Sequence, residues 1–217
     1  MQVMKHYLTE QEQQLLLKHL KSLASPIARR DLAWISLLKN AGLRITEFSL
    51  MTVAAAKFAL AKGWIYIPRE HRKGKRKGHE VPVTDAIRQD LNALLKLQLE
   101  LGGTGAIDEP LVMSRQGNAL SVRSYESRIH HWAQLLNLQA TPHALRHTCA
   151  MNIMRRSSAG DPRGVVQAIL GHADIRSSGV YTALNREEVR AAFEESHGPR
   201  RLRKRQVAKA YQHQVTA

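Results

Sequence analysis

The hydrophobic positions along the chain recur mostly at helical spacing. After Thr9, leucines follow one another every three or four residues behind a side chain suited to capping a helix, which predicts a first helix from about residue 9. Residues 31–38 and 44–61 carry the same period, with Gly42 between them. The amino-terminal part of the chain is therefore predicted to be helical.

The pattern changes over residues 63–84. The segment GWIYIP at 63–68 alternates as a strand does, and a second short strand is indicated at 80–83. The connection between them reads HRKGKRKGH, which is almost entirely basic. We expect an antiparallel hairpin, at about residues 63–84, whose turn carries strong positive charge.

Helical spacing then returns to the end of the predicted domain. A glycine-rich loop, LGGTGAIDEP, and a second loop, SSAGDPRG, separate the predicted helices, which cover residues 85–100, 121–138, 143–155 and 165–172. The expected fold class is mainly α with a small antiparallel β-sheet (α+β). We expect one domain over residues 1–197 and a basic tail over 198–217, either docked as a helix or solvated.

Charge narrows the range of partners. The chain has 33 Lys and Arg against 18 Asp and Glu, a net charge of +15, with a pI near 10.4. Such an excess favours a polyanionic partner, and nucleic acid is the first candidate. The alternative is a protein that is merely basic. With 217 residues, 43% of them hydrophobic, the chain is long enough for one sizeable core.

The expected location follows from the cysteine count and the apolar runs. Cys149 is the single cysteine and cannot form an internal disulfide, and the opening residues MQVMKHYLTEQEQQ contain no signal-peptide stretch. No run of eighteen apolar residues predicts a membrane span. We expect a cytoplasmic, nucleoid-associated protein with no membrane partner.

Two pairs of side chains suit phosphodiester chemistry. His143 and Arg146 are three residues apart and would share one helical face, where they could converge on a phosphate, and Arg44 could pair with Glu47 at the same spacing. Taken singly, each has an ordinary explanation as a surface ion pair or a helix cap. His143 and His147 have zinc-compatible spacing, but no third ligand follows, so no metal site is expected.

Three motifs in order resemble the tyrosine recombinases, a phage integrase-like family. AGLRITEFSL is similar to the first arginine motif, HALRHTCA to the His-x-x-Arg motif, and LGHADIRSSGVYTAL to the Leu-Gly-His motif followed by the nucleophilic tyrosine. His172 stands nine residues before Tyr181, a common spacing in that family. The resemblance spans about residues 9–190 and implies the tyrosine recombinase catalytic-domain fold.

The resemblance also implies an activity, which is site-specific DNA recombination or integration through a covalent 3′-phosphotyrosyl intermediate, without metal or nucleotide cofactor. Tyr181 would be the nucleophile, and His143 would assist proton transfer. Glu47 would support the site. The scissile phosphate would be contacted by Arg44, Arg146 and His172.

A lysine of the hairpin would protonate the departing 5′ oxygen. In the family this lysine usually lies eight residues before the proline of a Val-Pro pair, but here that position is Gly74. We favour Lys73, assuming one extra turn residue, over Lys75, with Lys77 as the third choice. The basic side chains of the turn could otherwise be plain phosphate contacts, and we expect DNA contacts from Arg72, Lys75, Arg76 and Lys77.

The resemblance further implies an assembly on double-stranded DNA. We expect a homotetramer in the DNA synapse, with the segment after Tyr181 reaching a neighbouring subunit, and accessory DNA-bending proteins. The chain is similar to fimbrial-switch invertases, a short form that lacks the amino-terminal core-binding domain. The alternative is that such a domain has been removed from this sequence. Two alternatives stay open: a type IB topoisomerase-like enzyme, and a non-catalytic DNA-binding regulator on a decayed recombinase fold.

Overall fold

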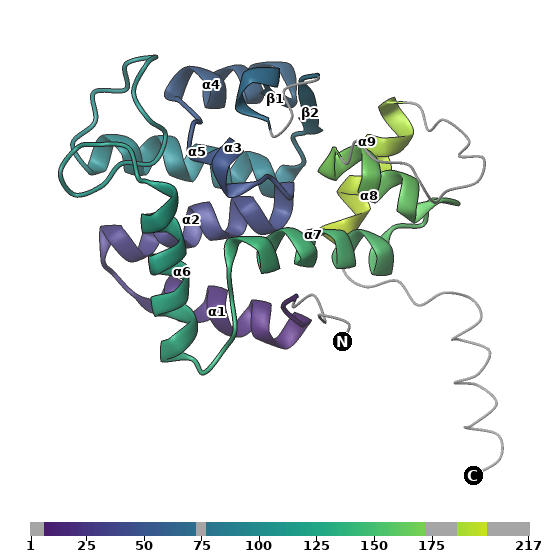
Figure 1. The fold of residues 1–217 in the computed structure, drawn as a ribbon, viewed down its shortest axis with the longest axis horizontal. Coiled ribbons are helices and arrows are strands. Elements are labelled where there is room, and N and C mark those ends of the chain that lie inside the picture. The colour runs from purple at the N-terminus through teal and green to yellow at the C-terminus, as the bar shows by residue number, and fades with distance from the viewer. Residues whose placement is uncertain (1–6, 73–76, 172–185, 199–217) are drawn as a thin grey trace, which may run out of the picture.

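The computed structural model describes residues 7–72, 77–171 and 186–198. This part of the chain is mostly helical and contains one two-stranded antiparallel sheet, which confirms the expected fold class (Figure 1). The elements are α1 (Glu10–Ser22), α2 (Pro26–Ala41), α3 (Ile45–Phe48), α4 (Val53–Lys62), β1 (Trp64–Ile67), η1 (Arg69–His71), β2 (His79–Pro82), α5 (Asp85–Glu100), α6 (Val122–Leu135), α7 (Pro142–Arg156), α8 (Pro162–Leu170) and α9 (Arg186–Ser196).

Local capping chemistry fixes the first two helices. At the start of α1 the Thr9 hydroxyl accepts a hydrogen bond from the Glu12 backbone N–H, and the Glu12 carboxylate accepts one from the Thr9 N–H, which completes a capping box. Helix α2 ends at Gly42, whose φ of 65° lies in the left-handed region that favours glycine. Both boundaries are confirmed as predicted.

Two predicted helix boundaries were wrong. Residues 44–61 form two helices instead of one, because Thr52 caps α4 by accepting from the Ala55 N–H and the chain there forms a bridge with Pro110. Helix α8 begins at Pro162, inside a predicted loop, because the Asp161 carboxylate caps its first turn.

The predicted hairpin is confirmed. Trp64 pairs with Pro82 and Ile67 with His79, in antiparallel register. Ile65 on β1 pairs with Val81 on β2, and both are buried, whereas Tyr66, which lies between Ile65 and the buried Ile67 on β1, is exposed, as the two-residue period of a half-buried strand requires.

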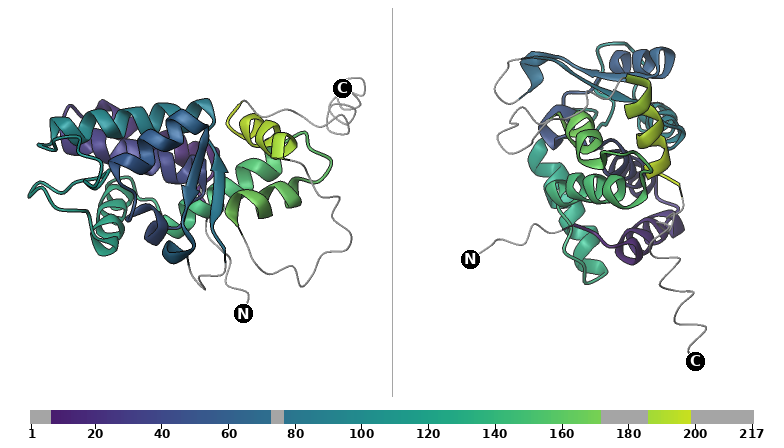
Figure 2. Two further views of the ribbon diagram at one scale, coloured as in Figure 1. Left: turned by 90° about the horizontal axis from the view of Figure 1, so that it is seen from above. Right: turned by 90° about the vertical axis from the view of Figure 1, so that its right-hand side faces the viewer.

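Helix α2 lies at the centre of the core. It packs against α1, α5 and α7, and its side chains Trp34, Ile35 and Leu37 are fully buried. Helices α8 and α9 pack against α7 on the far side of the molecule from α6, and α8 also contacts β2 (Figures 1 and 2). Within the described residues no helix is long and apolar enough to cross a membrane.

Helix α9 packs within its own chain. It lies on α7 and α8, with Val189, Ala192 and Phe193 buried. Burying an aromatic side chain and its aliphatic neighbours within one chain is itself favourable. This helix therefore belongs to the core of its own chain in this structure. The expected contact between the segment after Tyr181 and a neighbouring subunit stays a prediction.

One buried carboxylate joins α2 to α6. Asp31 is fully buried and accepts hydrogen bonds from the indole N–H of Trp34 at 2.9 Å and of Trp132 at 2.8 Å. Its other partners are the guanidinium groups of Arg30 and Arg128. Because every partner is a donor, only an anionic acceptor at this position satisfies them all.

Replacing that acceptor should cost stability. We expect Asp31→Asn to lower the free energy of unfolding by about 3–5 kcal/mol, because it leaves the buried Arg30 cation without its counter-charge and turns an amide donor toward other donors. Denaturant unfolding measures the difference. Asp108→Asn, which removes a charge from an exposed loop residue, should change the stability by less than about 0.5 kcal/mol. A loss from Asp31→Asn as small as that control would contradict the assignment.

Candidate active site

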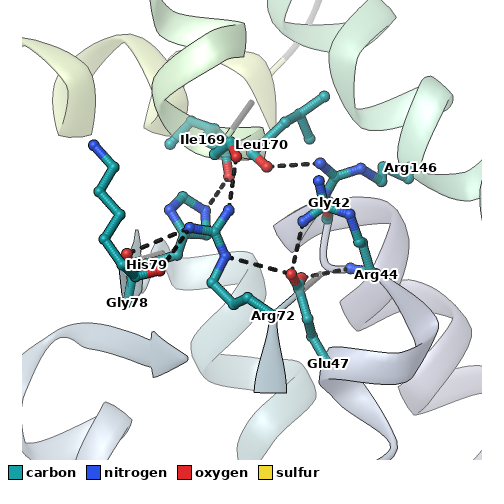
Figure 3. Close-up of polar contacts among 11 residues, drawn as sticks. Gly42, Arg44, Glu47, Arg72, Gly78, His79, Arg146, Ile169 and Leu170 are labelled. Carbon is teal, nitrogen blue, oxygen red and sulfur yellow. Dashed lines mark hydrogen bonds and ion pairs between the residues drawn. The ribbon is translucent and has the colours of Figure 1, made fainter. Parts of the chain in front are cut away.

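The site begins with a local ion pair at the start of α3. The backbone N–H of Arg44 donates to Glu47 Oε2 at 3.0 Å, and its Nη1 donates to Glu47 Oε1 at 2.7 Å. The Glu47 side chain is 1% exposed and that of Arg44 is 29% exposed. The predicted pairing is therefore confirmed, and the buried carboxylate holds a guanidinium that solvent and ligands can still reach (Figure 3).

Arg146 joins this pair from α7. Its Nη1 donates to the carbonyl oxygen of Gly42, and its Nη2 donates to that of Leu170 at 2.6 Å. Arg146 is 6% exposed, so α2, α7 and α8 fix its guanidinium from three directions. A guanidinium has five N–H groups, and these two hydrogen bonds leave three for other acceptors.

Arg72 enters the same cluster from the hairpin. Its Nη2 donates to the Gly171 carbonyl at 2.6 Å, its Nη1 donates to the Lys77 carbonyl at 3.1 Å, and its Nε lies 3.6 Å from Glu47 Oε1. The side chain is 9% exposed. The sequence predicted an open phosphate contact here, whereas the structure gives this guanidinium backbone partners within its own chain.

His79 was missed by the sequence reasoning. It is the first residue of β2, and its Nε2 lies 2.8 Å from the carbonyl oxygen of Ile169. Burial lowers the pKa of His79 to about 4, and the nearby cations Arg72 and Arg146 act in the same direction. The ring is therefore neutral at pH 7, and because a carbonyl only accepts, Nε2 carries the proton. In the sequence, the only indication of this role was the position of His79 at the carboxyl end of the basic connection.

Three guanidinium groups and one carboxylate make this cluster positive. The pKa of Arg146 is lowered to about 10, chiefly by burial and next by the neighbouring Arg44 cation, while Glu47 opposes the shift. A pKa of about 10 still leaves Arg146 charged at neutral pH. Forked, immobilised donors of this kind are well matched to the non-bridging oxygens of a phosphodiester.

Comparison with known sequences decides the family. The sequence pattern of the phage integrase family matches residues 6–188. The chain belongs to the phage integrase family.

Curated relatives agree with this membership. The chain is 33% identical over 179 residues to tyrosine recombinase XerC of Azotobacter vinelandii, a match that covers 82% of this chain and 56% of the relative. For XerC of Pseudomonas aeruginosa strain PAO1 the identity is 34%, with 82% and 55% covered. The chain thus spans just over half the length of these phage integrase family relatives.

Solved structures show the same fold. XerA recombinase superposes with a TM-score of 0.63 at 23% identity, covering 99% of this chain and 65% of that one. The Tn1549 transposon integrase in complex with transposon right end DNA gives a TM-score of 0.64 at 17% identity, covering 100% and 67%. At these identities the similarity establishes the phage integrase fold alone.

The remaining residues predicted from the phage integrase motifs are placed only in part. His143 lies on the exposed side of α7, with its Nε2 2.8 Å from that of His147, while Arg146 is buried and turned toward α8. Lys77 is exposed. Within the described residues no group of three or more His, Cys, Asp or Glu side chains could hold a metal ion. Outside the described part of the chain lie Lys73, Lys75, Arg76, His172 and Tyr181.

A second basic feature lies at the start of α6. We call it the arginine–serine hollow, a surface depression of about 780 Å³ whose polar lining includes Arg30, Arg115, Arg123, Arg128, Ser114, Ser121, Ser124 and Ser127. Arg30 and Arg128 are held by Asp31, whereas Arg115 and Arg123 are exposed. The hollow therefore presents two exposed guanidiniums beside several hydroxyl donors.

Proposed function

We propose that this chain is the catalytic part of a site-specific DNA recombinase, which cuts and rejoins strands through a 3′-phosphotyrosyl intermediate at Tyr181. The observation that carries the proposal is the meeting of Arg44 and Arg146, from two separate sequence motifs, beside the buried Glu47. The XerC relatives, named tyrosine recombinases, support the same reaction. Residues 1–197 would form the catalytic domain and 198–217 a basic tail.

The cationic cluster accounts for the reactivity of a tyrosine at neutral pH. A free phenol has a pKa of about 10 and is a poor nucleophile unless cations stabilise its charge and a base accepts its proton. Arg44 and Arg146 would also bind the two non-bridging oxygens, where negative charge grows in the pentacoordinate transition state. In our proposal His143 and His172 orient the phosphate and move protons.

The proposed cleavage step needs no cofactor, because one phosphorus–oxygen bond forms as another breaks. The Tyr181 oxygen attacks phosphorus, the bond from phosphorus to the 5′ oxygen breaks, and that oxygen takes a proton from a hairpin lysine. We favour Lys73 for this role over Lys75 and Lys77. Because the phosphotyrosyl ester retains the energy of the broken phosphodiester, a DNA hydroxyl can attack it and restore the backbone.

The proposed partner is double-stranded DNA. The net charge of +15 favours a polyanion, and a structurally similar integrase was solved in complex with transposon DNA. Four subunits would bring two DNA sites together, assisted by DNA-bending proteins. DNA contacts from Lys75, Arg76 and Lys77 and a cytoplasmic, nucleoid-associated location complete the proposal.

A trapping experiment tests the reaction. A duplex carrying the inverted repeats nearest the gene, nicked beside the cleavage position, loses a short strand after cleavage and cannot be rejoined. We expect an adduct of protein and DNA that resists SDS, and recombinants from substrates with two sites. Relaxation of supercoiled DNA without a second site would favour the topoisomerase alternative. Binding without any adduct would favour the regulator.

The arginine–serine hollow supplies a test of DNA binding. We expect the double variant Arg115→Ala with Arg123→Ala to weaken binding and to reduce the slope of log affinity against log salt by about 2, one unit for each lost phosphate contact. A salt titration of Kd measures this. Lys18→Ala with Lys21→Ala removes the same charge from exposed positions on α1 and should change the slope less. Equal slopes for both double variants would remove the hollow from the DNA interface.

A further inference from the structure

The carboxyl end of α8 is held by side chains from other elements. The last carbonyl groups of a helix have no partner within it. Here three successive carbonyl oxygens each accept a hydrogen bond, at 2.8, 2.6 and 2.6 Å, and the donors to Ile169, Leu170 and Gly171 are His79, Arg146 and Arg72 respectively. Two of these three donors come from the hairpin, and Figure 3 shows them converging on α8.

The two hairpin donors stand at opposite ends of its basic connection. Arg72 follows η1, and His79 begins β2. Arg72 also donates from Nη1 to the carbonyl oxygens of Lys77 at 3.1 Å and Gly78 at 3.4 Å. The Arg72 side chain therefore joins the two ends of the connection to each other, and together with His79 it joins both ends to α8.

We propose that Arg72 and His79 are positioning residues, which hold the base of the hairpin against the end of α8 and thereby align the proton donor with the phosphate. The inference rests on the proposed function, in which a hairpin lysine protonates the leaving oxygen. In sequence Lys73 follows Arg72 directly, and His172 follows Gly171. The clamp thus fixes the residue before each of these two predicted catalytic side chains.

Gly171 leaves space for this clamp. A Cβ atom added there would lie 2.7 Å from Arg72 Nη2 and 2.8 Å from His79 Nδ1, which is closer than real Cβ atoms approach. Its φ of 61° also lies in the left-handed region. The glycine therefore ends α8 and also lets both donors reach the carbonyl groups.

The chemistry of His79 defines a matched pair of variants. The ring is neutral and donates from Nε2, a role that the amide N–H of glutamine can reproduce and leucine cannot. We expect His79→Leu to slow single-turnover cleavage about 10- to 100-fold at saturating DNA, because a small misplacement of a catalytic group is costly. The Kd for DNA should be unchanged, and His79→Gln should restore most of the rate. His71→Leu changes a histidine that lies in the same connection but makes no hydrogen bond to α8 among the described residues, and it should behave as the unmodified protein.

A sulfur-substituted DNA separates proton donation from general structural damage. When sulfur replaces the 5′ bridging oxygen, the leaving group is a thiolate, which departs without a proton because a thiol has a pKa of only about 8.5. The defect of His79→Leu should therefore be large on ordinary DNA and nearly disappear on the sulfur substrate. A merely structural role would slow both substrates equally.

Gly171→Ala offers a second variant for comparing cleavage of ordinary and sulfur-substituted DNA. It should separate the hairpin from α8 without removing the side chain of Arg72 or His79. Its control is Gly63→Ala, which has a similar positive φ of 73° but leaves the new Cβ no nearer than 3.7 Å to a neighbour. We expect Gly171→Ala to cleave ordinary DNA slowly and the sulfur substrate at nearly the normal rate, and we expect Gly63→Ala to cleave both at the normal rate.

The outcomes separate this inference from the function on which it rests. Normal cleavage by His79→Leu and Gly171→Ala on ordinary DNA would overturn the clamp, and so would an equal defect on both substrates. In either case adduct formation by the unmodified protein would leave the proposed function standing. If the unmodified protein forms no adduct on either DNA, the proposed function fails and the clamp's role in proton donation fails with it.

Discussion

Tyr181→Phe should abolish the covalent adduct on nicked DNA while leaving DNA affinity unchanged. The substitution removes one oxygen atom, the one that forms the bond to phosphorus, and no other side chain in the proposed site can supply a phenolate. Without its nucleophile the enzyme cannot form the covalent intermediate at all, so we expect the yield of adduct to fall below the detection limit. Gel analysis after SDS treatment measures the yield of adduct, and a parallel binding experiment measures the Kd for DNA.

Tyr66→Phe is the matched control for this prediction. Tyr66 is exposed on β1, so its hydroxyl can be lost without opening the core. We expect this variant to form the adduct at the normal rate. A full yield of adduct from Tyr181→Phe would show that another group attacks the phosphate, and the assignment from the motif spacing would be wrong.

Arg146→Lys should slow cleavage by about 10²–10³-fold, equivalent to about 2.7–4 kcal/mol of transition-state stabilisation. The Arg146 guanidinium donates hydrogen bonds to the carbonyl oxygens of both Gly42 and Leu170, and its remaining N–H groups are available to a phosphate. An ammonium on a flexible stem keeps the charge but not the planar fork. Single-turnover cleavage at saturating DNA measures the effect on the chemical step.

Arg88→Lys controls for the exchange itself. Arg88 on α5 also donates to a backbone carbonyl, that of Leu60 at 3.2 Å, but it takes no part in the cluster around Glu47. We expect normal cleavage from it. Thermal unfolding of both variants shows whether Arg146→Lys remains folded at the assay temperature. Cleavage by folded Arg146→Lys at the rate of the control would contradict a forked contact to the phosphate.

Much of the fold could be predicted because its signals are local. Capping by Thr9, the left-handed Gly42 and the alternation around Ile65 each depend on residues within a few positions of one another. The pair between Arg44 and Glu47 is equally local, since the first turn of a helix brings residues three apart into contact. The break between α3 and α4 was missed because it depends on pairing with the distant Pro110.

By itself, the sequence determined the helical class, the hairpin, the family motifs and the chemical types of the site residues. The tertiary structure alone decided that Arg146 reaches Gly42 and Leu170, that Arg72 turns inward, and that His79 joins the site. The physical reason is the same in each case. A buried donor takes its partner from whichever unpaired carbonyl group packing brings within reach, and that neighbour is set by how distant segments fold together.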